Sequence, residues 1–368
     1  MKILAPLSDE SEVVALVEAG ADEFFCGLFP AGWFERWGRA AWPNRRGPGP
    51  ANIEELDDLA RLADSVHKHR DRSQKQAQLP LFVTMNQQFY SDEQAEFLLE
   101  QAKTIAARGS ADAVIVTDPG FMRLLGAELP QLPIFASTVS VALNSESVLF
   151  LQELGCARVI VSRHLHLEEL ADLQAALPGV PLEVFLLNDN CYFEEGFCST
   201  AHALPGFGVY CMTPWEFEVC RDDHGGAPIE DPDEKERWNF LIDEHLALQR
   251  SLSHQGYGAG TTSLPLGPCG LCAVPELIEM GIHSGKIVGR EAGLYRKLRS
   301  VQAVRYVRDS YLETRDGRET RRRALELRGD PQGCADGFFC YYRSARDRDL
   351  VTMPSRARGP RPPRNKDL

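Results

Sequence analysis

The sequence has no long apolar run. None of its stretches approaches the roughly 20 consecutive apolar residues that a membrane-spanning helix needs. The N-terminal segment MKILAPLSDESEVV also lacks the apolar stretch of an export signal. We therefore expect a cytoplasmic protein without a membrane span. Because the cytoplasm is reducing, its ten cysteines are expected to remain thiols rather than to form a disulfide framework.

Two common hydrolase motifs are also missing. The chain contains no H-E-x-x-H metalloprotease helix and no G-x-S-x-G nucleophile elbow. Its cysteines are too many and too clustered to single out one nucleophile beside a histidine. The residues themselves therefore offer little support for proteolysis.

Positive charge is scarce over most of the chain. The 40 Lys and Arg residues face 53 Asp and Glu residues, so the formal net charge is −13. The chain therefore lacks the broad basic face that binds duplex nucleic acid by displacing counterions. The exception is the segment 343–368, which is rich in arginine and proline. We expect a disordered basic tail there, because it cannot bury enough apolar surface to offset its ordering entropy. Contact with RNA or a partner is the alternative, so nucleic acid is not excluded.

Eight short apolar runs alternate with amphipathic stretches. The runs are KILAPL, DEFFCGL, LPLFVTMNQQF, ADAVIVTD, LPIFASTVSV, RVIVSRHL, PLEVFLLN and SGKIVG. We expect helices at residues 8–20, 52–69, 91–108, 145–155 and 167–177. Near-continuous apolar strands separated by helices predict a parallel sheet that is covered on its outer face. Eight such units predict an α/β fold of the (β/α)8 TIM-like barrel type.

Two connections are too long to be simple turns. Residues 29–51 follow the second predicted strand, and residues 188–265 follow the seventh. Both insertions fall on the face where barrels of this type hold their active sites. The expected organisation is a barrel at 1–310 with a cysteine-rich insertion at 188–272, a C-terminal extension at 311–342 and a basic flexible tail at 343–368.

Cysteines gather in the second half of the chain. Thiolates bind both iron–sulfur clusters and zinc. Zinc ribbons usually carry two C-x2-C pairs, whereas here only Cys269 and Cys272 have that spacing. The pattern therefore favours a cluster, with zinc or no metal as alternatives. The six cysteines of this region are Cys191, Cys198, Cys211, Cys220, Cys269 and Cys272.

The other four cysteines are interpreted differently. Cys26 and Cys156 lie in or beside apolar runs and are expected to be buried as small apolar residues. Cys334 and Cys340 flank the segment ADGFF, and their spacing is not diagnostic. They are interpreted as structural, with extra ligands or a second site together with Cys220 as alternatives.

Polar residues at the ends of predicted strands would converge if the barrel forms. Asp118 precedes Pro-Gly, so capping of the next helix is an alternative role for this residue. For Arg290 the alternative role is an ion pair with Glu183 or Glu291. Together with Arg45 from the first insertion, Arg163 and Arg290 are expected to bind a carboxylate-bearing substrate. The polar residues at strand ends are Thr84, Asn86, Asp118, Ser137, Thr138, Arg163, Lys286 and Arg290.

Several longer segments resemble a known family. They include ILAPLSDESEVVALVEAGADEFFCG, IFASTVSVALNSESVLFLQELGCARVIVSR, PLEVFLLNDNCYFEEGFCSTAH and GPCGLCAVPELIEMGIHSGKIVGRE. These segments resemble the collagenase-like peptidases of unknown catalytic type, peptidase family thirty-two. That family also includes oxygen-independent hydroxylases of ubiquinone precursors, tRNA and ribosomal RNA. The resemblance covers about residues 1–310, with a further similarity at GCADGFFCYY.

The resemblance implies a cofactor and its ligands. Hydroxylases of this family hold a 4Fe-4S cluster on four cysteines, which here correspond to Cys191, Cys198, Cys211 and Cys269. The match to the family pattern is incomplete. The region of Cys211 lacks the second nearby cysteine that many relatives have, and Cys272 has no counterpart in that pattern. Cys272 or Cys220 could therefore replace one of the four ligands. Many relatives named as peptidases carry a His-Gly pair where this chain has Leu187-Asn188, which removes that histidine as a general base.

The expected function is an iron–sulfur-dependent, oxygen-independent hydroxylation of an aromatic or nucleobase substrate. In this hypothesis Asp118 or His202 moves a proton, while Arg163 and Arg290 orient an anionic group. A role for His202 as a ligand or as a plain loop residue stays open. Residues expected to bind substrate are Arg45, Asn86, Ser137, Thr138 and Lys286. The alternatives are a peptidase of the family, or a non-catalytic, zinc-stabilised barrel that forms a hetero-oligomer with a related subunit.

Overall fold

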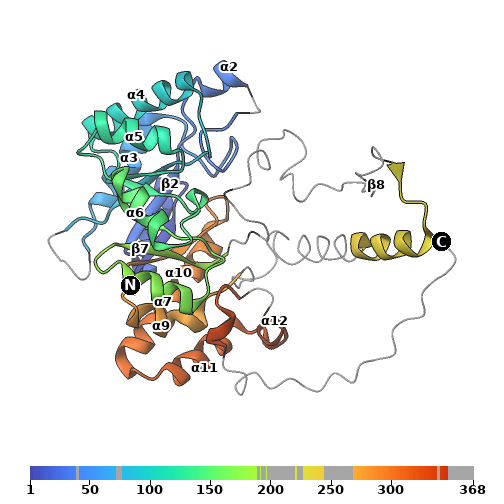
Figure 1. Ribbon diagram of the computed structural model, residues 1–368. Helices are drawn as coiled ribbons and strands as arrows, with labels where there is room; N and C mark the ends of the chain where they lie inside the picture. Colours follow the sequence, from blue (N-terminus) through green and yellow to red (C-terminus); the bar gives the residue numbers. More distant parts are fainter. Residues whose placement is uncertain are drawn as a thin grey trace.

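Eight parallel strands close into a barrel (Figure 1). The computed structural model describes residues 1–38, 41–71, 77–188, 191, 196, 220–221, 227–243, 268–337 and 340–346. Around the barrel the order is β1-β10-β7-β6-β5-β4-β3-β2. The strands are β1 (Lys2–Pro6), β2 (Glu23–Gly27), β3 (Leu81–Met85), β4 (Ala113–Val116), β5 (Ile134–Ala136), β6 (Cys156–Ile160), β7 (Leu182–Leu187) and β10 (Ser284–Ile287). The predicted (β/α)8 barrel is confirmed.

Helices cover the outer face of the barrel. They are α1 (Val13–Ala19), α2 (Trp33–Trp37), α3 (Leu56–His67), α4 (Asp92–Arg108), α5 (Pro119–Glu128), α6 (Ser145–Glu153), α7 (Leu167–Ala176) and α9 (Val274–Glu279). The five predicted helices are present with shorter ends. The predicted helix at 52–69 begins only at Leu56, because Ile53 is used in a bridge to Leu28 beside the barrel. Within the described residues, no helix is long and apolar enough to cross a bilayer.

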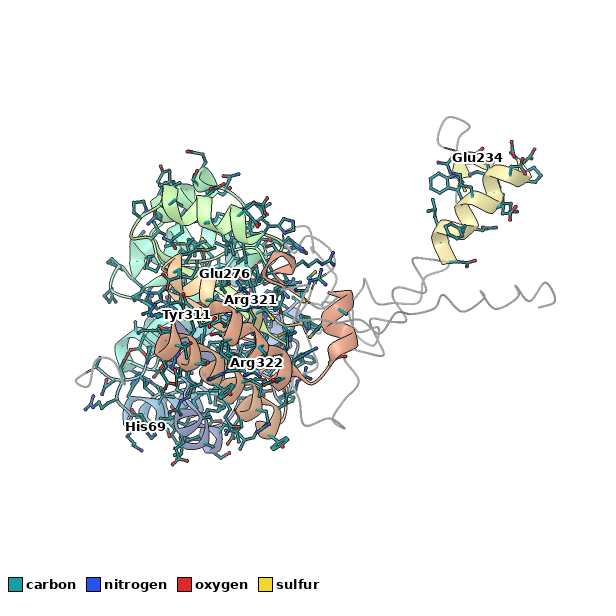
Figure 2. All side chains as sticks on the ribbon, turned by 90° about the horizontal axis from the view of Figure 1, so that it is seen from below. His69, Glu234, Glu276, Tyr311, Arg321 and Arg322 are labelled. Carbon is teal, nitrogen blue, oxygen red and sulfur yellow. The ribbon has the colours of Figure 1, made fainter. Side chains whose placement is uncertain are left out.

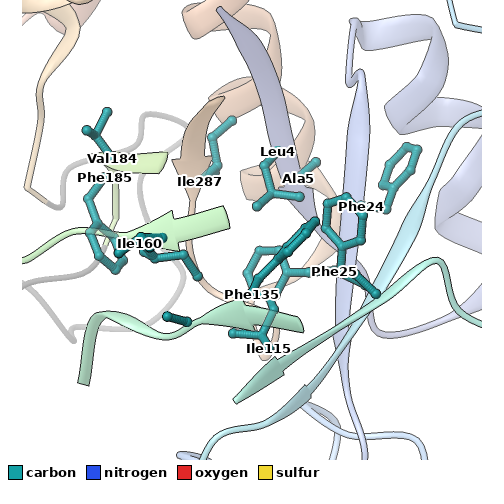
Figure 3. Packing of buried hydrophobic residues seen from close by; sticks show 14 of the residues in the cluster. Leu4, Ala5, Phe24, Phe25, Ile115, Phe135, Ile160, Val184, Phe185 and Ile287 are labelled. Atoms are coloured by element: carbon teal, nitrogen blue, oxygen red, sulfur yellow. The ribbon is translucent and has the colours of Figure 1, made fainter. Parts of the chain in front are cut away.

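Apolar side chains fill the barrel and the layer between strands and helices. Figure 3 shows part of this core, with Phe25, Phe135 and Phe185 contributed by three different strands. All six residues of β7 are buried, which explains why its sequence lacks the polar alternation of a half-exposed strand. The rings of Phe82 and Phe135 meet edge to face, 4.8 Å apart.

Charged residues close the end of the barrel where the strands begin. Arg158 donates to Glu23 at 2.8 and 2.9 Å and to Glu183 at 3.2 Å, and Lys286 donates to Glu183 at 2.9 Å. Burial opposes ionisation of Glu23, but hydrogen bonds from His283 and Arg158 outweigh it and hold the pKa of this carboxyl below its usual range. These ion pairs link strands β2, β6, β7 and β10. Their position at the N-terminal end indicates a role in stability.

The C-terminal part packs against the same barrel. Helix α10 (Leu294–Thr314) runs through the predicted boundary at residue 310 and is followed by α11 (Gly317–Arg328) and α12 (Pro331–Asp336). An ion pair between Arg321 and Glu276 joins α11 to α9, and Tyr311 donates to Glu279 at 2.9 Å (Figure 2). The segment 311–336 is thus largely helical, and α11 contacts the barrel's covering helix α9.

The insertion after β7 is described only in part. Strands β8 (Cys220–Arg221) and β9 (Ala227–Pro228) pair antiparallel, and residues 232–243 are helical. Three predicted site residues, Cys198, Cys211 and His202, lie outside the described residues. Most of the predicted basic tail, from residue 347 onward, also lies outside them.

Candidate functional site at the barrel mouth

The guanidinium of Arg290 joins three segments at the C-terminal end of the barrel. Arg290 follows β10 and is 5% exposed. Its Nη1 donates to Oγ1 of Thr84 at 2.6 Å, and its Nη2 donates to Oδ1 of Asn44 at 3.2 Å. Thr84 lies on β3, whereas Asn44 belongs to the insertion after β2. A buried cation thus sits where parallel barrels bind their substrates.

Glycine is required beside this arginine. A Cβ atom on Gly27, the last residue of β2, would lie 2.0 Å from Nη1 of Arg290 and 2.1 Å from Oδ1 of Asn52. The missing side chain therefore leaves space for the guanidinium and for the insertion after β2. Asn52 in turn accepts a hydrogen bond from Nδ2 of Asn44 at 2.8 Å.

A second hydrogen-bonded chain crosses the mouth. The backbone N–H of Arg45 donates to Oδ1 of Asn86 at 3.4 Å, and Nδ2 of Asn86 donates to Oγ of Ser137 at 3.1 Å. The guanidinium of Arg45 donates to Gln88 at 3.1 Å, and Gln88 donates to the carbonyl of Gly196 at 3.0 Å. The structure thus brings the predicted residues Arg45, Asn86 and Ser137 together, and it brings the insertion after β7 to the same mouth.

A cavity of about 260 Å³ lies beside this chain. Gln88 and Gly196 line it on the side of the mouth, and Thr117 and Ser140 contribute hydroxyl groups. Phe150 of α6 forms an apolar wall and is half exposed. The cavity therefore combines apolar walls with a few polar groups, as small-molecule sites commonly do.

Three other predicted site residues have partners within the protein, and only Lys286 of these lies inside its strand. Lys286 lies within β10 rather than after it, and burial lowers the pKa of its ammonium even though Glu183 opposes that shift. The guanidinium of Arg163 stacks 4.1 Å from the ring centre of Phe185. The hydroxyl of Thr138 donates to the carbonyl of Val161 at 3.2 Å. Their predicted functional roles stay predictions.

Asp118 caps helix α5, which was the alternative role that the sequence allowed for this residue. One carboxylate oxygen accepts the backbone N–H of Phe121 at 2.8 Å at the start of α5, and the other accepts that of Tyr90 at 2.9 Å. Tyr90 in turn donates its hydroxyl to Pro43 at 2.6 Å. Asp118 therefore holds the loop after β3 against the start of α5. Proton transfer would be a second role of the same side chain and stays a prediction.

The described cysteines are all thiols. Cys26 and Cys156 are buried as predicted, and burial raises their pKa to about 12. Cys269 lies at the C-terminal end of β7, where it forms an antiparallel bridge with Leu187. Cys191 follows the same strand by four residues and is partly buried. Among the described residues, no three His, Cys, Asp or Glu side chains stand close enough to hold a single metal ion.

Asn44, Gln88 and Gly27 also belong to this site, although the sequence alone did not predict them. Asn44 is fully buried although it lies in a segment rich in glycine and proline, so its composition suggested an exposed loop. Gly27 carried the clearest available signal, since a glycine at a strand end often marks a close approach of another group.

The fold and the mouth define a (β/α)8 barrel protein with a polar, arginine-containing site at the C-terminal ends of its strands. The chain belongs to peptidase family U32, because the model of that family matches residues 9–349. The resemblance found in the sequence is thereby confirmed over nearly the whole chain.

Several relatives carry informative names. The tRNA hydroxylation protein P of Escherichia coli (strain K12) is 28% identical over 246 residues, which cover 56% of this chain and 52% of that protein. The 23S rRNA 5-hydroxycytidine synthase of the same strain is 27% identical over 180 residues, covering 46% of this chain and 24% of that protein. This chain thus spans about half the length of the first relative and less of the second. The solved structure of a U32 peptidase matches with a TM-score of 0.41 and 15% identity over 57% of this chain and 80% of that chain.

Proposed function

We propose that this barrel performs an oxygen-independent hydroxylation of a nucleobase in RNA. The observation that carries the proposal is the buried Arg290 at the barrel mouth, held by Thr84 and Asn44. The relatives named for hydroxylation of tRNA and rRNA support the reaction and the RNA substrate. A cytoplasmic location and pairing with a related subunit stay sequence-based predictions.

The residues at the mouth are suited to bind a planar base together with its anionic phosphate. The guanidinium groups of Arg45 and Arg290 supply charge, and the Asn86–Ser137 pair supplies a donor and an acceptor for a base edge. The cavity beside them, lined by Phe150 and Ser140, accepts a flat ring. In the proposal these groups orient the substrate, and Asp118 or His202 carries the proton.

An iron–sulfur cluster is part of this proposal, with zinc as the alternative metal. Its proposed ligands are Cys191, Cys198, Cys211 and Cys269. The donor set fits, because thiolates are the ligands that such clusters need, Cys191 follows the end of β7, and Cys269 forms a bridge with the last residue of that strand, Leu187. When bound, the cluster would supply electron transfer or activate the oxygen donor.

Nucleoside mass spectrometry tests the proposal. We expect RNA from cells that contain the gene to carry a nucleoside one oxygen atom heavier than its parent, and RNA from cells without the gene to lack it. Complementation with the wild-type chain should restore this nucleoside. Identical nucleoside profiles in tRNA and rRNA of both cell types would contradict the proposal.

Peptidase activity is the alternative that the family name carries. It can be measured separately by incubating the purified chain with a denatured protein and following cleavage on a gel. Cleavage that persists in the Arg290→Ala variant, together with unchanged RNA, would favour the peptidase over the hydroxylase.

A further inference from the structure

Two phenylalanine rings are exposed at the cavity beside the barrel mouth. Phe150 of α6 lines the cavity and is 52% exposed. Phe89 is 57% exposed and directly follows Gln88, another residue of the lining. Most described phenylalanines, such as Phe25 and Phe135, are buried in the core instead. Single apolar residues on a surface are ordinary, whereas two exposed rings at one cavity indicate a binding site. We call Phe89 and Phe150 the aromatic rim.

The loop that carries Phe89 is held on both sides of this residue. Before it, the side chain of Gln88 donates to the carbonyl of Gly196 at 3.0 Å. After it, the N–H of Tyr90 donates to the carboxylate of Asp118 at 2.9 Å. The exposed ring is thus carried by a hydrogen-bonded backbone, so little additional entropy is lost when a ligand stacks on it.

Phe150 also has a defined position. Helix α6 is capped by Asn144, whose Oδ1 accepts the N–H of Ser147 at 2.9 Å. Val148 and Leu151 of the same helix are buried in the core. The cap and the buried face therefore hold the helix in place, while the ring of Phe150 stays at the cavity wall.

The hydroxyl groups of the cavity lining already donate their protons within the protein. Thr117 donates to the carbonyl of Asn86 at 3.1 Å, and Ser140 donates to the carbonyl of Thr117 at 3.3 Å. Ser147 donates to Oδ1 of Asn144 at 3.0 Å. Because a hydroxyl group has only one proton, each of these oxygens can only accept a further hydrogen bond. The cavity therefore favours a ligand that brings N–H donors.

The size of the cavity narrows the class of ligand. Its volume of about 260 Å³ lies below the roughly 300–1,000 Å³ of pockets for drug-sized molecules, so it suits a single ring system. A nucleobase has N–H groups at its edge and a flat face that stacks on aromatic rings. An apolar side chain of a protein partner would stack on the rim but would leave the hydroxyl oxygens without donors. The observations therefore favour a base.

We propose that the aromatic rim binds unpaired nucleobases, one in the cavity against Phe150 and a neighbouring one on Phe89, so that RNA is taken as a single strand or loop. This inference rests on the proposed function, because a nucleobase substrate in RNA supplies the ligand. Bases within a duplex are covered on both faces by their neighbours and cannot use the rim. The guanidinium of Arg45, which donates to Gln88 at 3.1 Å, supplies positive charge beside the rim for the phosphates of the strand.

Fluorescence anisotropy of the full chain with labelled RNA tests the rim. The probe is a short single-stranded RNA of mixed sequence, compared with the same strand annealed to its complement at the same salt concentration. Phe89→Ala and Phe150→Ala should each weaken binding of the single strand roughly 5- to 150-fold, because each removes the stacking of one base. Phe89→Tyr and Phe150→Tyr keep the ring and should bind like the wild type. Tyr306→Ala removes an exposed ring of α10 that does not line the cavity, and it is the matched control.

The duplex should bind at least about 10-fold more weakly than the single strand. Wild-type affinity in both alanine variants, equal affinity for the two RNAs, or no binding of either RNA overturns the proposal. Unchanged RNA affinity together with a smaller oligomer in sedimentation would make the rim a protein contact, which also overturns it. Ultraviolet cross-linking of the wild-type chain to the single strand needs no variant. Adducts are expected on the peptides that hold Phe89 or Phe150, and adducts confined to other peptides contradict the proposal.

Nucleoside mass spectrometry separates this proposal from the proposed function. Binding of single-stranded RNA that depends on the two rings, in cells whose RNA lacks any hydroxylated nucleoside, would support the rim and contradict hydroxylation. A wild-type level of hydroxylated nucleoside in the Phe89→Ala/Phe150→Ala variant would overturn the rim and leave hydroxylation intact.

Discussion

Arg290 reaches across the barrel mouth to Thr84, with Nη1 only 2.6 Å from Oγ1. The contact joins the segment after the last strand to the third strand, and its short length fits a charge-assisted hydrogen bond. It also places the charge beside the ring of Phe25, 6.0 Å from the ring centre. Arg290 thus connects β3 and β2 with the segment after β10, where the proposal places the substrate.

Replacing Arg290 with alanine should reduce formation of the hydroxylated nucleoside roughly 10- to 100-fold, since hydrogen bonds to charged groups contribute about 1.5–3 kcal/mol. Arg290→Lys should form little more of this nucleoside than Arg290→Ala, because an ammonium group does not reproduce the planar fork of a guanidinium. Arg315→Ala, which removes an exposed arginine paired with Glu279, is the matched control and should leave the product level unchanged. Nucleoside mass spectrometry after complementation measures all three, and normal product in Arg290→Ala would count against a role for the mouth.

Gly27→Ala should mimic the loss of Arg290 without removing any charge. The new methyl group would collide with the guanidinium and with Asn52, so we expect a loss of about 1–3 kcal/mol in the free energy of unfolding together with reduced product. Gly293→Ala is the control, because a Cβ atom there meets nothing within 4 Å. Urea unfolding and nucleoside analysis of Gly27→Ala and Gly293→Ala test this prediction. Equal stability of the two variants would show that the residues of the mouth can move to accommodate the methyl group.

Acid should destabilise the protein through Glu23. The folded-state pKa of this carboxyl lies below its ordinary 4.5 despite burial, because His283 and Arg158 bond to it. Its contribution to stability is therefore complete above pH 4.5 and is lost as the pH falls from there toward the folded-state pKa.

Urea unfolding at pH 7 and pH 3 measures this effect. Glu23→Gln should lose about 1.5–3 kcal/mol at pH 7, because Arg158 loses one of its two carboxylate partners and keeps Glu183. The variant should then lose less stability than the wild type between the two pH values. The exposed Glu313→Gln serves as the control. Equal losses for wild type and Glu23→Gln between the two pH values would exclude Glu23 as the cause.

Two substitutions of Asp118 separate its structural role from its proposed catalytic one. Asp118→Ala removes the cap of α5 and should cost about 1 kcal/mol in the free energy of unfolding. Asp118→Asn keeps one oxygen for the N–H of Phe121 but loses the acceptor for the N–H of Tyr90, so it should also lose about 1 kcal/mol. If Asp118 also moves a proton, Asp118→Asn abolishes product although its stability is close to that of Asp118→Ala. Full product with Asp118→Asn would restrict this residue to capping.

Local patterns were sufficient to predict the strands, whereas the site needed long-range information. Runs such as PLEVFLLN are apolar throughout because β7 is buried on both faces, and this is visible in the sequence. The start of α3 was misplaced because Ile53 pairs with Leu28, which no local pattern signals. Lys286 was expected after its strand, but the ion pair with Glu183 holds it inside the barrel.

The cysteines show the same limit. The spacing of the cysteines in and after the insertion predicted a single group of metal ligands. The burial of Cys26 was evident from its apolar neighbours in the sequence. The meeting of Cys269 with Cys340 depends instead on helices α10 and α11 returning the chain to the end of β7. Spacing alone carries no information about such a return, because the intervening helices set the distance.

The pairing of the first strand with the last has a consequence for biosynthesis. Lys2 pairs with Ser284, so the ring cannot close until the ribosome has made β10. Synthesis of residues 188–283 takes roughly 5–20 s at about 5–20 residues per second. Throughout that interval β1 and β7 are open edges of an unfinished sheet, which exposes them to pairing with other nascent chains. A chaperone that shields these edges during translation would therefore raise the yield of this protein more than one that acts after release.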